Sequence, residues 1–261
     1  MKNPIEDLRE YRGFLESIPM EKYRKELKDV KWVEQDLPRE ILPLNSIFKH
    51  YWEERKFLDF EKWFEEFWIE INTFSESKKS LEEFKKYYFN RTIEENDWFK
   101  KGFKARMYRT WISVLTQLDF CYVFEYVCAI KGINLQLECN AELDEKGIDA
   151  RVNDIGFQVA KISHRKEARS GSKKKTIITI PYPVFNIEEI KRKIISNRVK
   201  KENKIRYQKI LEAFNRYFIQ LKNGFIVFGE KYIEEIVNNI NDIEKVREAV
   251  NKIWKELSGE F

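Results

Sequence analysis

The stretch ECNAELDEKGIDARVNDIGFQVAKIS, Glu138 to Ser163, decides the fold of this chain. Apolar and polar residues alternate around Asp149, which predicts a strand that carries Asp149 on a mainly polar face. Turn-forming residues follow at 153–156, and the apolar run 157–162 predicts the returning strand of a hairpin. We therefore expect two paired strands that carry several carboxylates and a lysine.

The charged side chains of this hairpin are suited to hold Mg²⁺. Asp149 and Lys161 would face each other across neighbouring strands, with Glu142 and Asp144 just upstream. Carboxylate oxygens are the ligands that Mg²⁺ prefers, and Mg²⁺ beside a phosphodiester activates a water. A bend at Gly147 is needed if Asp144 and Asp149 are to converge; the alternative for Asp144 is an acid in a surface turn.

Composition excludes several other kinds of site. The 261 residues are 43% hydrophobic and 15% aromatic, enough for a sizeable core. Cys121, Cys128 and Cys139 lie in apolar surroundings without a CxxC pair, so we expect reduced core cysteines. The chain has no P-loop, GxGxxG, GxSxG or HExxH, and only His50 and His164 are available for a histidine-based site. Chemistry based on oxygen ligands and a lysine remains. His50, before Tyr51 and Trp52, is expected to be structural.

The sequence offers no sign of a membrane partner. No run approaches the ~18 uncharged apolar residues of a membrane span, and the first residues lack the apolar core of a signal peptide. We expect a cytoplasmic protein.

Charge is unevenly distributed along the chain. Residues 161–175 contain seven basic side chains and one acidic one, a surplus larger than the net charge of +5, while residues 53–70 contain seven acids and three bases. Such segregation suggests a basic face for a polyanion such as DNA; a solvated loop is the alternative. The candidate DNA contacts are His164, Arg165, Lys166, Arg169, Lys173, Lys174 and Lys175, with Arg106 and Arg109 on a helix whose basic side chains equally suit a solvated face.

Periodicity predicts a small mixed sheet flanked by helices. Helices are expected over 4–27 (two short ones), 60–71, 78–89, 98–130, 187–195, 205–221, 232–240 and 243–257, and further strands at 133–138, 176–185 and 224–229. The last of these strands is expected in a sheet centre, and the proline-containing segment 33–48 as an extended connector. The fold class is thus α/β, a single domain with a helical N-terminal region, 1–97, and a core with C-terminal helices, 98–261.

Several motifs carry a family resemblance. DAR followed by a strand that ends in a lysine resembles the PD-(D/E)XK nuclease core. VEQDLPREILPL, HYW at 50–52, ARMYRTW and LTQ within 105–117, AELDEKGIDARV and QVAK resemble the TaqI-type restriction endonucleases in matching order, well over about 33–169 and loosely in the C-terminal third. The resemblance implies a type II restriction enzyme that uses Mg²⁺ to cut both strands of duplex DNA at a short palindrome. For the closest family members this is TCGA, cut after the T.

The resemblance assigns roles within the hairpin. It identifies Asp144 and Asp149 as the functional acids and Lys161 as the lysine. We expect Asp149 to be the main Mg²⁺ ligand, Asp144 or Glu142 to add a second carboxylate, and Lys161 to orient or deprotonate the water. Gln158, a candidate catalytic residue, is expected to support the groups that act directly. Glu125, a candidate metal ligand, is expected to do the same, because it lies in an apolar helical stretch where a charge needs a partner or a metal nearby. A palindromic target favours a homodimer, and the system implies a cognate DNA methyltransferase.

The chain departs from the nuclease pattern at one position. The pattern has an acid or amide two residues before the lysine, where this chain has Val159. An even hairpin loop centred on 154–155 would place Asp149 opposite Ala160, whereas an odd loop or a bulge would bring Lys161 there; we predict the odd loop or bulge. Two other functions stay open: a repair or recombination nuclease that recognises DNA shape, and a DNA-binding protein that has lost catalysis.

Overall fold

The computed structural model describes residues 3–27, 30, 36–88, 94–162 and 176–259. The chain divides into two compact units, Gly13–Leu118 and the combination of Met1–Arg12 with Asp119–Phe261. Two helices, α1 (Pro4–Ser17) and α6 (Glu94–Lys131), belong in part to each unit. The division falls inside α6, and the single domain with regions 1–97 and 98–261 stays a prediction.

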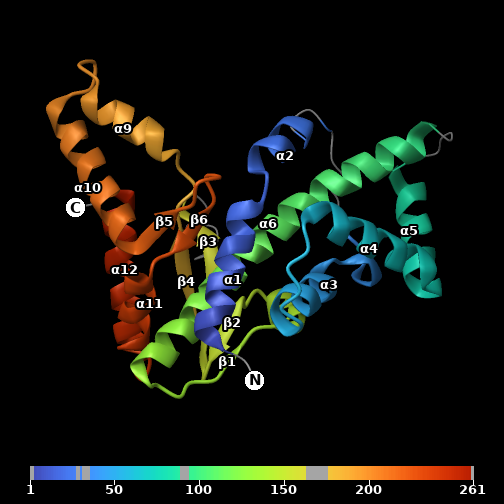
Figure 1. Cartoon of the computed structure of the whole chain (residues 1–261), viewed down its shortest axis with the longest axis horizontal. Coiled ribbons are helices and arrows are strands. Elements are labelled where there is room, and N and C mark those ends of the chain that lie inside the picture. The colour runs from blue at the N-terminus through green and yellow to red at the C-terminus, as the bar shows by residue number, and fades with distance from the viewer. Residues whose placement is uncertain (1–2, 28–29, 31–35, 89–93, 163–175, 260–261) are drawn as a thin grey trace. The chain divides into compact units, whose positions relative to one another are not determined.

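The unit Gly13–Leu118 is helical, as the sequence predicts (Figure 1). It contains α2 (Met20–Leu27), η1 (Arg39–Ile41), α3 (Leu44–Phe48), the π-helical turn η2 (Lys49–Glu53), α4 (Phe60–Thr73) and α5 (Ser75–Tyr88). The described part of the expected extended connector instead forms η1 and α3. Pro38 and Pro43 directly precede these helices. Proline is tolerated at a helix start because the first N–H groups have no partner within the helix.

The aromatic face of α4 forms the core of this unit. Asp59 caps the helix by accepting a hydrogen bond from the Lys62 N–H (3.0 Å). The side chains of Phe60, Trp63 and Phe67 are buried, and the rings of Trp63 and Phe67 stack at 5.5 Å between centroids. This confirms the prediction that these aromatics are core residues and not a platform for bases.

The long helix α6 contains a long apolar stretch. Among the described residues, Trp98–Lys131 is the one helical stretch long and apolar enough to cross a membrane by length and composition. This stretch contains the acids Asp119 and Glu125, so it is not an uncharged apolar run. Moreover, 67% of the apolar window is buried inside the protein, as in the core helix of a soluble protein.

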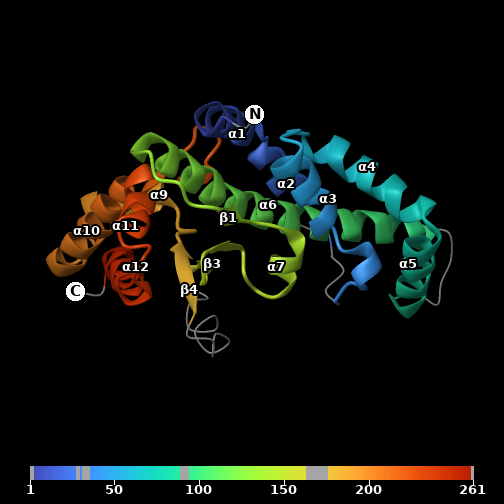
Figure 2. The ribbon, with the colours of Figure 1, turned by 90° about the horizontal axis from the view of Figure 1, so that it is seen from below.

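The second unit contains the predicted small mixed sheet. Its order is β1 (Leu137–Glu138), β2 (Ala150–Val152), β3 (Ile155–Lys161) and β4 (Ile177–Tyr182). The first three strands are antiparallel, and β3 and β4 are parallel. Figure 2 shows a short helix, α7 (Ala141–Glu145), between β1 and the β2–β3 hairpin. No element was predicted for these residues; Asn140 caps this helical turn by accepting from the Leu143 N–H (2.9 Å).

The C-terminal part adds helices and a separate sheet. The helices are α9 (Ile187–Ile195), α10 (Lys201–Tyr217), α11 (Glu230–Val237) and α12 (Ile243–Ser258). All four were predicted, but α10 lies earlier than the expected 205–221, and α11 ends before the expected residue 240. After α10 the chain forms β5 (Phe218–Gln220), which pairs with β6 (Ile226–Phe228) in a two-stranded sheet. The apolar strand at 224–229 is thus buried but lies outside the four-stranded sheet. Gly224, at φ +87, permits the tight turn between these two strands.

Aromatic packing fixes the hairpin against the end of α6. The Phe120 ring lies 5.5 Å from the ring of Phe157 on β3 and 5.5 Å from that of Phe228 on β6. All three side chains are fully buried. Deletion of any of these rings would leave a cavity, so the position of β3 relative to α6 is well determined by packing.

A buried carboxylate joins three elements of this unit. Asp119 is 0% exposed and lies 3.8 Å from the Arg12 guanidinium. Its Oδ2 accepts a hydrogen bond from the Phe228 N–H (2.6 Å), and Arg12 donates to the Phe228 carbonyl oxygen (2.6 Å). Burial raises the pKa of Asp119 to about 6, although Arg12 and the Phe228 N–H lower it.

This pKa predicts a dependence of stability on pH. A raised folded-state pKa contributes stability that is present below pH ~4 and is lost as the pH rises through about 6. In Asp119→Asn, which keeps an acceptor for the Phe228 N–H, this dependence is absent. The free energy of unfolding of the wild type, minus that of the variant, should fall by about 2 kcal/mol between pH 4 and 8 in urea titrations. A difference that does not change with pH would mean that Arg12 keeps Asp119 ionised throughout.

Candidate active site

The β2–β3 hairpin has a two-residue loop. Val152 pairs with Ile155, so the loop is Asn153–Asp154. Asn153 adopts a positive φ of 52°, which asparagine tolerates better than most residues. The expected odd loop is therefore wrong, and the loop is centred one residue earlier than assumed.

The pairing of the two strands is irregular at Asp149 and not in the loop. The N–H of Asp149 donates to the Phe157 carbonyl oxygen (2.8 Å), although Phe157 already pairs with Ala150. Asp149 and Ala150 thus both lie opposite Phe157, which is the pattern of a β-bulge. A bulge was the second of the two predicted alternatives. The Asp149 carboxylate accepts a hydrogen bond from the Val159 N–H (2.5 Å). Asp149 thus faces Val159, and neither Ala160 nor Lys161.

The two predicted acids converge at the bend expected at Gly147. The N–H of Gly147, at φ +74, donates to the Asp144 carbonyl oxygen (2.8 Å), and Ile148 donates to Leu143 (3.0 Å). These bonds reverse the chain directly after α7. The carboxyl groups of Asp144 and Asp149 come into hydrogen-bonding contact as a result.

The electrostatics of this pair are unfavourable for two free anions. Asp149 is only 4% exposed. Burial and the nearby Asp144 carboxylate raise the pKa of Asp149 well above its usual value, against the opposing effect of the Val159 N–H. Two adjacent carboxylates at this depth are stable only with a shared proton or a bound cation. The arrangement therefore fits a divalent metal ion.

The other two carboxylates predicted for the metal site, Glu142 and Glu125, lie outside the Asp144–Asp149 pair. Glu142 is exposed and pairs with Lys146 at 2.6 Å, so α7 directs it away from Asp144. The role of Glu142 as a metal ligand stays a prediction. Glu125 lies one helical turn after Cys121 on α6, and both Glu125 and Asp149 contribute to raising the pKa of that thiol, after burial and Cys139. Glu125 is consequently close to the site but not part of the carboxylate pair.

The cysteines are reduced core residues, as predicted. Cys121, Cys128 and Cys139 are free and buried. The Cys121 thiol donates to the sulfur of Cys139 at 3.2 Å. This contact joins α6 to the segment after β1 and helps to hold the chain that leads into α7.

The side-chain amide of Gln158 and the side-chain amine of Lys161, both on β3, lie in different surroundings. The Gln158 amide nitrogen lies beside Gly147, 3.8 Å from where a Cβ would stand, so Gln158 packs against the bend that carries the acids. Lys161 is exposed at the end of β3 and forms no hydrogen bond or ion pair with any described residue. The expected contact between Lys161 and the acids is absent from the part of the chain that the structure describes.

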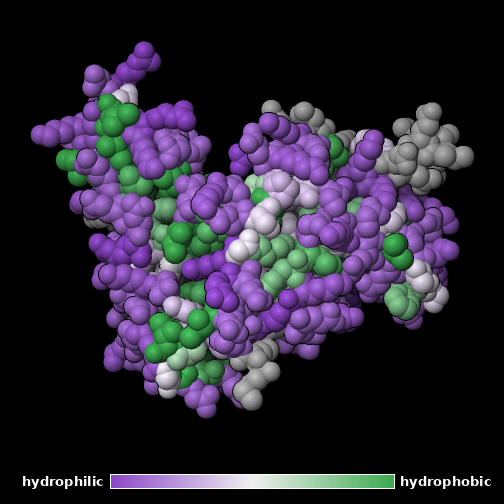
Figure 3. Space-filling view, in the orientation of Figure 1, coloured by the Kyte–Doolittle hydropathy of each residue, from purple (hydrophilic) through white to green (hydrophobic). Residues whose placement is uncertain are grey.

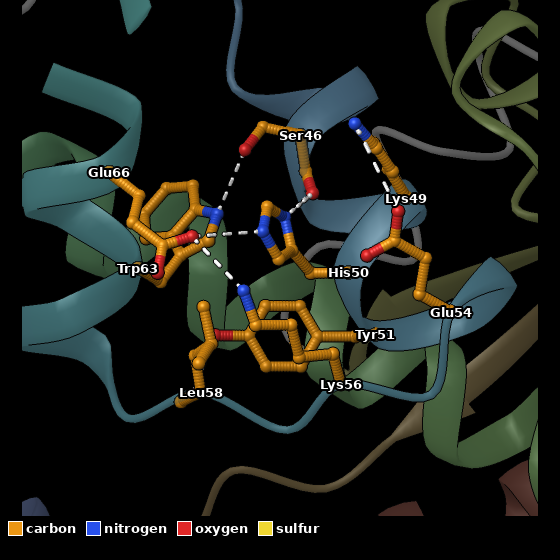
Figure 4. Close-up of polar contacts among 9 residues, drawn as sticks. All are labelled: Ser46, Lys49, His50, Tyr51, Glu54, Lys56, Leu58, Trp63 and Glu66. Atoms are coloured by element: carbon orange, nitrogen blue, oxygen red, sulfur yellow. Dashed lines mark hydrogen bonds and ion pairs between the residues drawn. The ribbon is translucent and has the colours of Figure 1, made fainter. Parts of the chain in front are cut away.

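His50 has a structural environment (Figure 4). Its Nδ1 lies 2.8 Å from the Ser46 carbonyl oxygen, and its Nε2 lies 3.2 Å from Glu66 Oε2. Lys56 also reaches this oxygen, at 3.4 Å, and Trp63 donates to the Ser46 hydroxyl at 3.1 Å. These contacts join η2 to α4, which agrees with the structural role expected for His50.

The basic residues of α6 are partly neutralised. Lys100 and Lys104 form ion pairs with Glu65 (3.2 Å) and Glu61 (2.5 Å) of the acidic segment. Arg106 is half-buried and Arg109 is exposed, and both have interactions within the protein. The remaining predicted DNA contacts lie outside the described residues: His164, Arg165, Lys166, Arg169, Lys173, Lys174 and Lys175.

The described residues contain no group of three or more His, Cys, Asp or Glu side chains that could hold a metal. Among these residues, Asp144 and Asp149 bring two carboxylates together. The sequence motif missed one contributor, the backbone N–H of Val159, because a motif records side chains only.

Comparison with known proteins shows which family the sequence resembles. The TaqI restriction endonuclease family matches residues 8–240. The type II restriction enzyme TthHB8I of Thermus thermophilus is 33% identical over 246 residues, covering 88% of this chain and 87% of that protein. The type II restriction enzyme TaqI of Thermus aquaticus is 33% identical over 244 residues, covering 88% and 86%. No solved structure matches. The chain therefore belongs to the TaqI restriction endonuclease family, a family of type II site-specific deoxyribonucleases.

Proposed function

We propose that this protein hydrolyses phosphodiester bonds in both strands of duplex DNA at a short palindrome, with Mg²⁺ held by Asp144 and Asp149. The convergence of these two carboxylates on the β2–β3 hairpin is the observation that carries the proposal. A pair that is unfavourable without a cation, in a family of restriction enzymes, is best explained as a metal site. The mixed sheet with its acid-bearing hairpin supports a PD-(D/E)XK-type core.

The chain's own residues would prepare the site in three ways. The Val159 N–H fixes the rotamer of Asp149 and leaves its other oxygen for the ion. The bend at Gly147 delivers Asp144, and Gln158 packs against that bend. A bound Mg²⁺ supplies charge stabilisation at the phosphate and a lower pKa for the attacking water. Remaining coordination would come from water and phosphate oxygens, because two carboxylates do not complete an octahedron.

Lys161 is proposed to act on the DNA and not on the acids. Its amine has no partner among the described residues, and its side chain is exposed at the end of β3. A cation in this position is suited to contact the scissile phosphate or to orient the water once DNA is present. This role rests on the family resemblance of the QVAK motif.

Further properties follow from the proposed activity. On the family resemblance we propose TCGA as the cleaved sequence, cut after the T. A palindrome read on both strands implies a two-fold homodimer. A restriction activity also requires a cognate DNA methyltransferase in the same cell, and the protein would act in the cytoplasm.

Digestion of plasmid DNA tests this function. With Mg²⁺ the protein is expected to give discrete fragments, and excess EDTA should abolish cutting because the ion is removed. Fragment ends are then sequenced. Cutting only at junctions or flaps would instead indicate a repair nuclease. Tight binding without any cutting would indicate a DNA-binding protein that has lost catalysis.

A further inference from the structure

The helical hairpin of α9 and α10 concentrates positive charge. Residues 188–209 contain nine basic and three acidic side chains, a surplus that exceeds the net charge of +5 of the whole chain. The basic residues are Lys191, Arg192, Lys193, Arg198, Lys200, Lys201, Lys204, Arg206 and Lys209. The rest of the chain is therefore close to neutral, and this hairpin is the main basic feature among the described residues.

Some of these charges are neutralised and some are not. Lys191 pairs with Glu188 at 2.7 Å, and Lys193 pairs with Glu189 at 2.6 Å. In contrast, the side chains around the turn have no hydrogen bond or ion pair with any residue that the structure describes: Arg198, Lys200, Lys201 and Lys204. Three of the four are exposed, and Lys204 is half-buried. Like charges gathered without counterions repel one another, and a polyanion would remove this repulsion.

The hairpin leaves the sheet at the same end as the proposed catalytic lysine. Lys161, the last residue of β3, pairs with Tyr182, the last residue of the parallel strand β4. The chain then enters α9 at Ile187. DNA that contacts Lys161 at the end of β3 would therefore lie next to the end of β4, where the chain continues into the α9–α10 hairpin.

We propose that the α9–α10 hairpin binds the phosphate backbone of duplex DNA outside the recognition sequence. This rests on the proposed cleavage at a short palindrome. The 17 residues of α10 extend about 25 Å at 1.5 Å per residue. A duplex rises about 3.4 Å per base pair, so a helix of this length spans about seven base pairs, more than the four of TCGA. Contacts along it are contacts to flanking phosphates, which add affinity and position without reading sequence.

One feature of the hairpin suits a different partner. Ile195, at the end of α9, is 77% exposed, and Figure 3 shows a hydrophobic group near the turn within an otherwise hydrophilic surface. An apolar side chain among cations is also found at membrane surfaces. The uncompensated charge favours DNA, and binding to anionic vesicles is therefore included as an outcome that decides against it.

The test is the salt dependence of binding without divalent metal. The wild type and the variant Arg198→Gln/Lys200→Gln/Lys201→Gln/Lys204→Gln are titrated against a 30-base-pair duplex over a range of KCl concentrations. The matched control carries Lys78→Gln, Lys79→Gln, Lys231→Gln and Lys252→Gln, four exposed lysines without a described partner. Circular dichroism checks folding, and the double variant Lys200→Gln/Lys201→Gln serves if the fourfold variant does not fold.

The slope of log K against log salt should become less steep by about 3.6 in the hairpin variant, since each of the four lost phosphate contacts removes about 0.9. Affinity near 100 mM salt should fall more than about 10-fold, and the control should change neither value comparably. Equal slopes in the hairpin and control variants would overturn the proposal. So would charge-dependent binding to vesicles with 30% anionic lipid that exceeds binding to the duplex. A wild type that binds but does not cut would sink the proposed function and leave this comparison valid.

Discussion

The Asp149→Asn variant is expected to lose DNA cleavage by about 10³-fold while the protein becomes no less stable. The metal's stabilisation of the reacting phosphate is worth several kcal/mol, and each 1.36 kcal/mol corresponds to a factor of ten. The amide removes one of the two carboxylates that would hold the ion. Its oxygen can still accept the hydrogen bond from the Val159 N–H, so the hairpin should keep its geometry.

The stability of this variant provides the control. Because burial and Asp144 raise the pKa of Asp149, ionisation of Asp149 destabilises the fold as the pH rises. The amide avoids this, so the thermal midpoint of the metal-free variant at pH 8 should equal or exceed that of the wild type. Duplex binding without metal should be retained. An inactive variant that is also less stable would point to a structural role for Asp149 instead.

The second large effect is expected within α7, where two carboxylates two residues apart should behave differently. Asp144→Asn should reduce cleavage by about 10²-fold or more, since its carboxyl group contacts that of Asp149. Glu142→Gln removes an acid from the same helix that is exposed and paired with Lys146. It should retain cleavage within about twofold.

Initial rates on plasmid DNA at saturating Mg²⁺ measure both variants. The comparison controls for net charge, because each substitution removes one negative charge. Equal losses in the two variants would mean that α7 acts through its charge alone. A larger loss in Glu142→Gln would reverse the assignment of the second ligand and would require α7 to rotate when DNA binds.

The acid-bearing hairpin was largely predictable from sequence, and the reasons are local. Alternation predicted a strand through Asp149, and the observed strand β2 begins one residue later, at Ala150. The positive φ that glycine permits at Gly147 provides the bend that brings Asp144 to Asp149. Periodicity likewise gave α4 and its buried aromatic face. These features depend on residues within a few positions of one another.

What the sequence did not predict depends on competition between local signals. The Asn140 cap stabilises the short helix α7, for which no element was predicted. The bulge at Asp149 was predicted only as one of two alternatives, because hairpin loop length is not encoded by alternation. The contribution of Val159 was hidden because it comes from the backbone. The strands β5 and β6 pair in a sheet of their own, and the Phe228 ring on β6 packs against Phe120, which is far away in the sequence.

Binding of Mn²⁺, a probe for Mg²⁺, tests most directly whether Asp144 and Asp149 form the metal site. Electron paramagnetic resonance would follow Mn²⁺ titrated into the wild type, Asp149→Asn, Asp144→Asn and Glu142→Gln in the presence of a duplex with a non-hydrolysable phosphate at the cleaved position. We expect Mn²⁺ to bind tightly to the wild type and to Glu142→Gln, and at least about 10-fold more weakly to each aspartate variant. Equal Mn²⁺ affinity in all four proteins would contradict this expectation, because the metal would then be held by residues other than this pair.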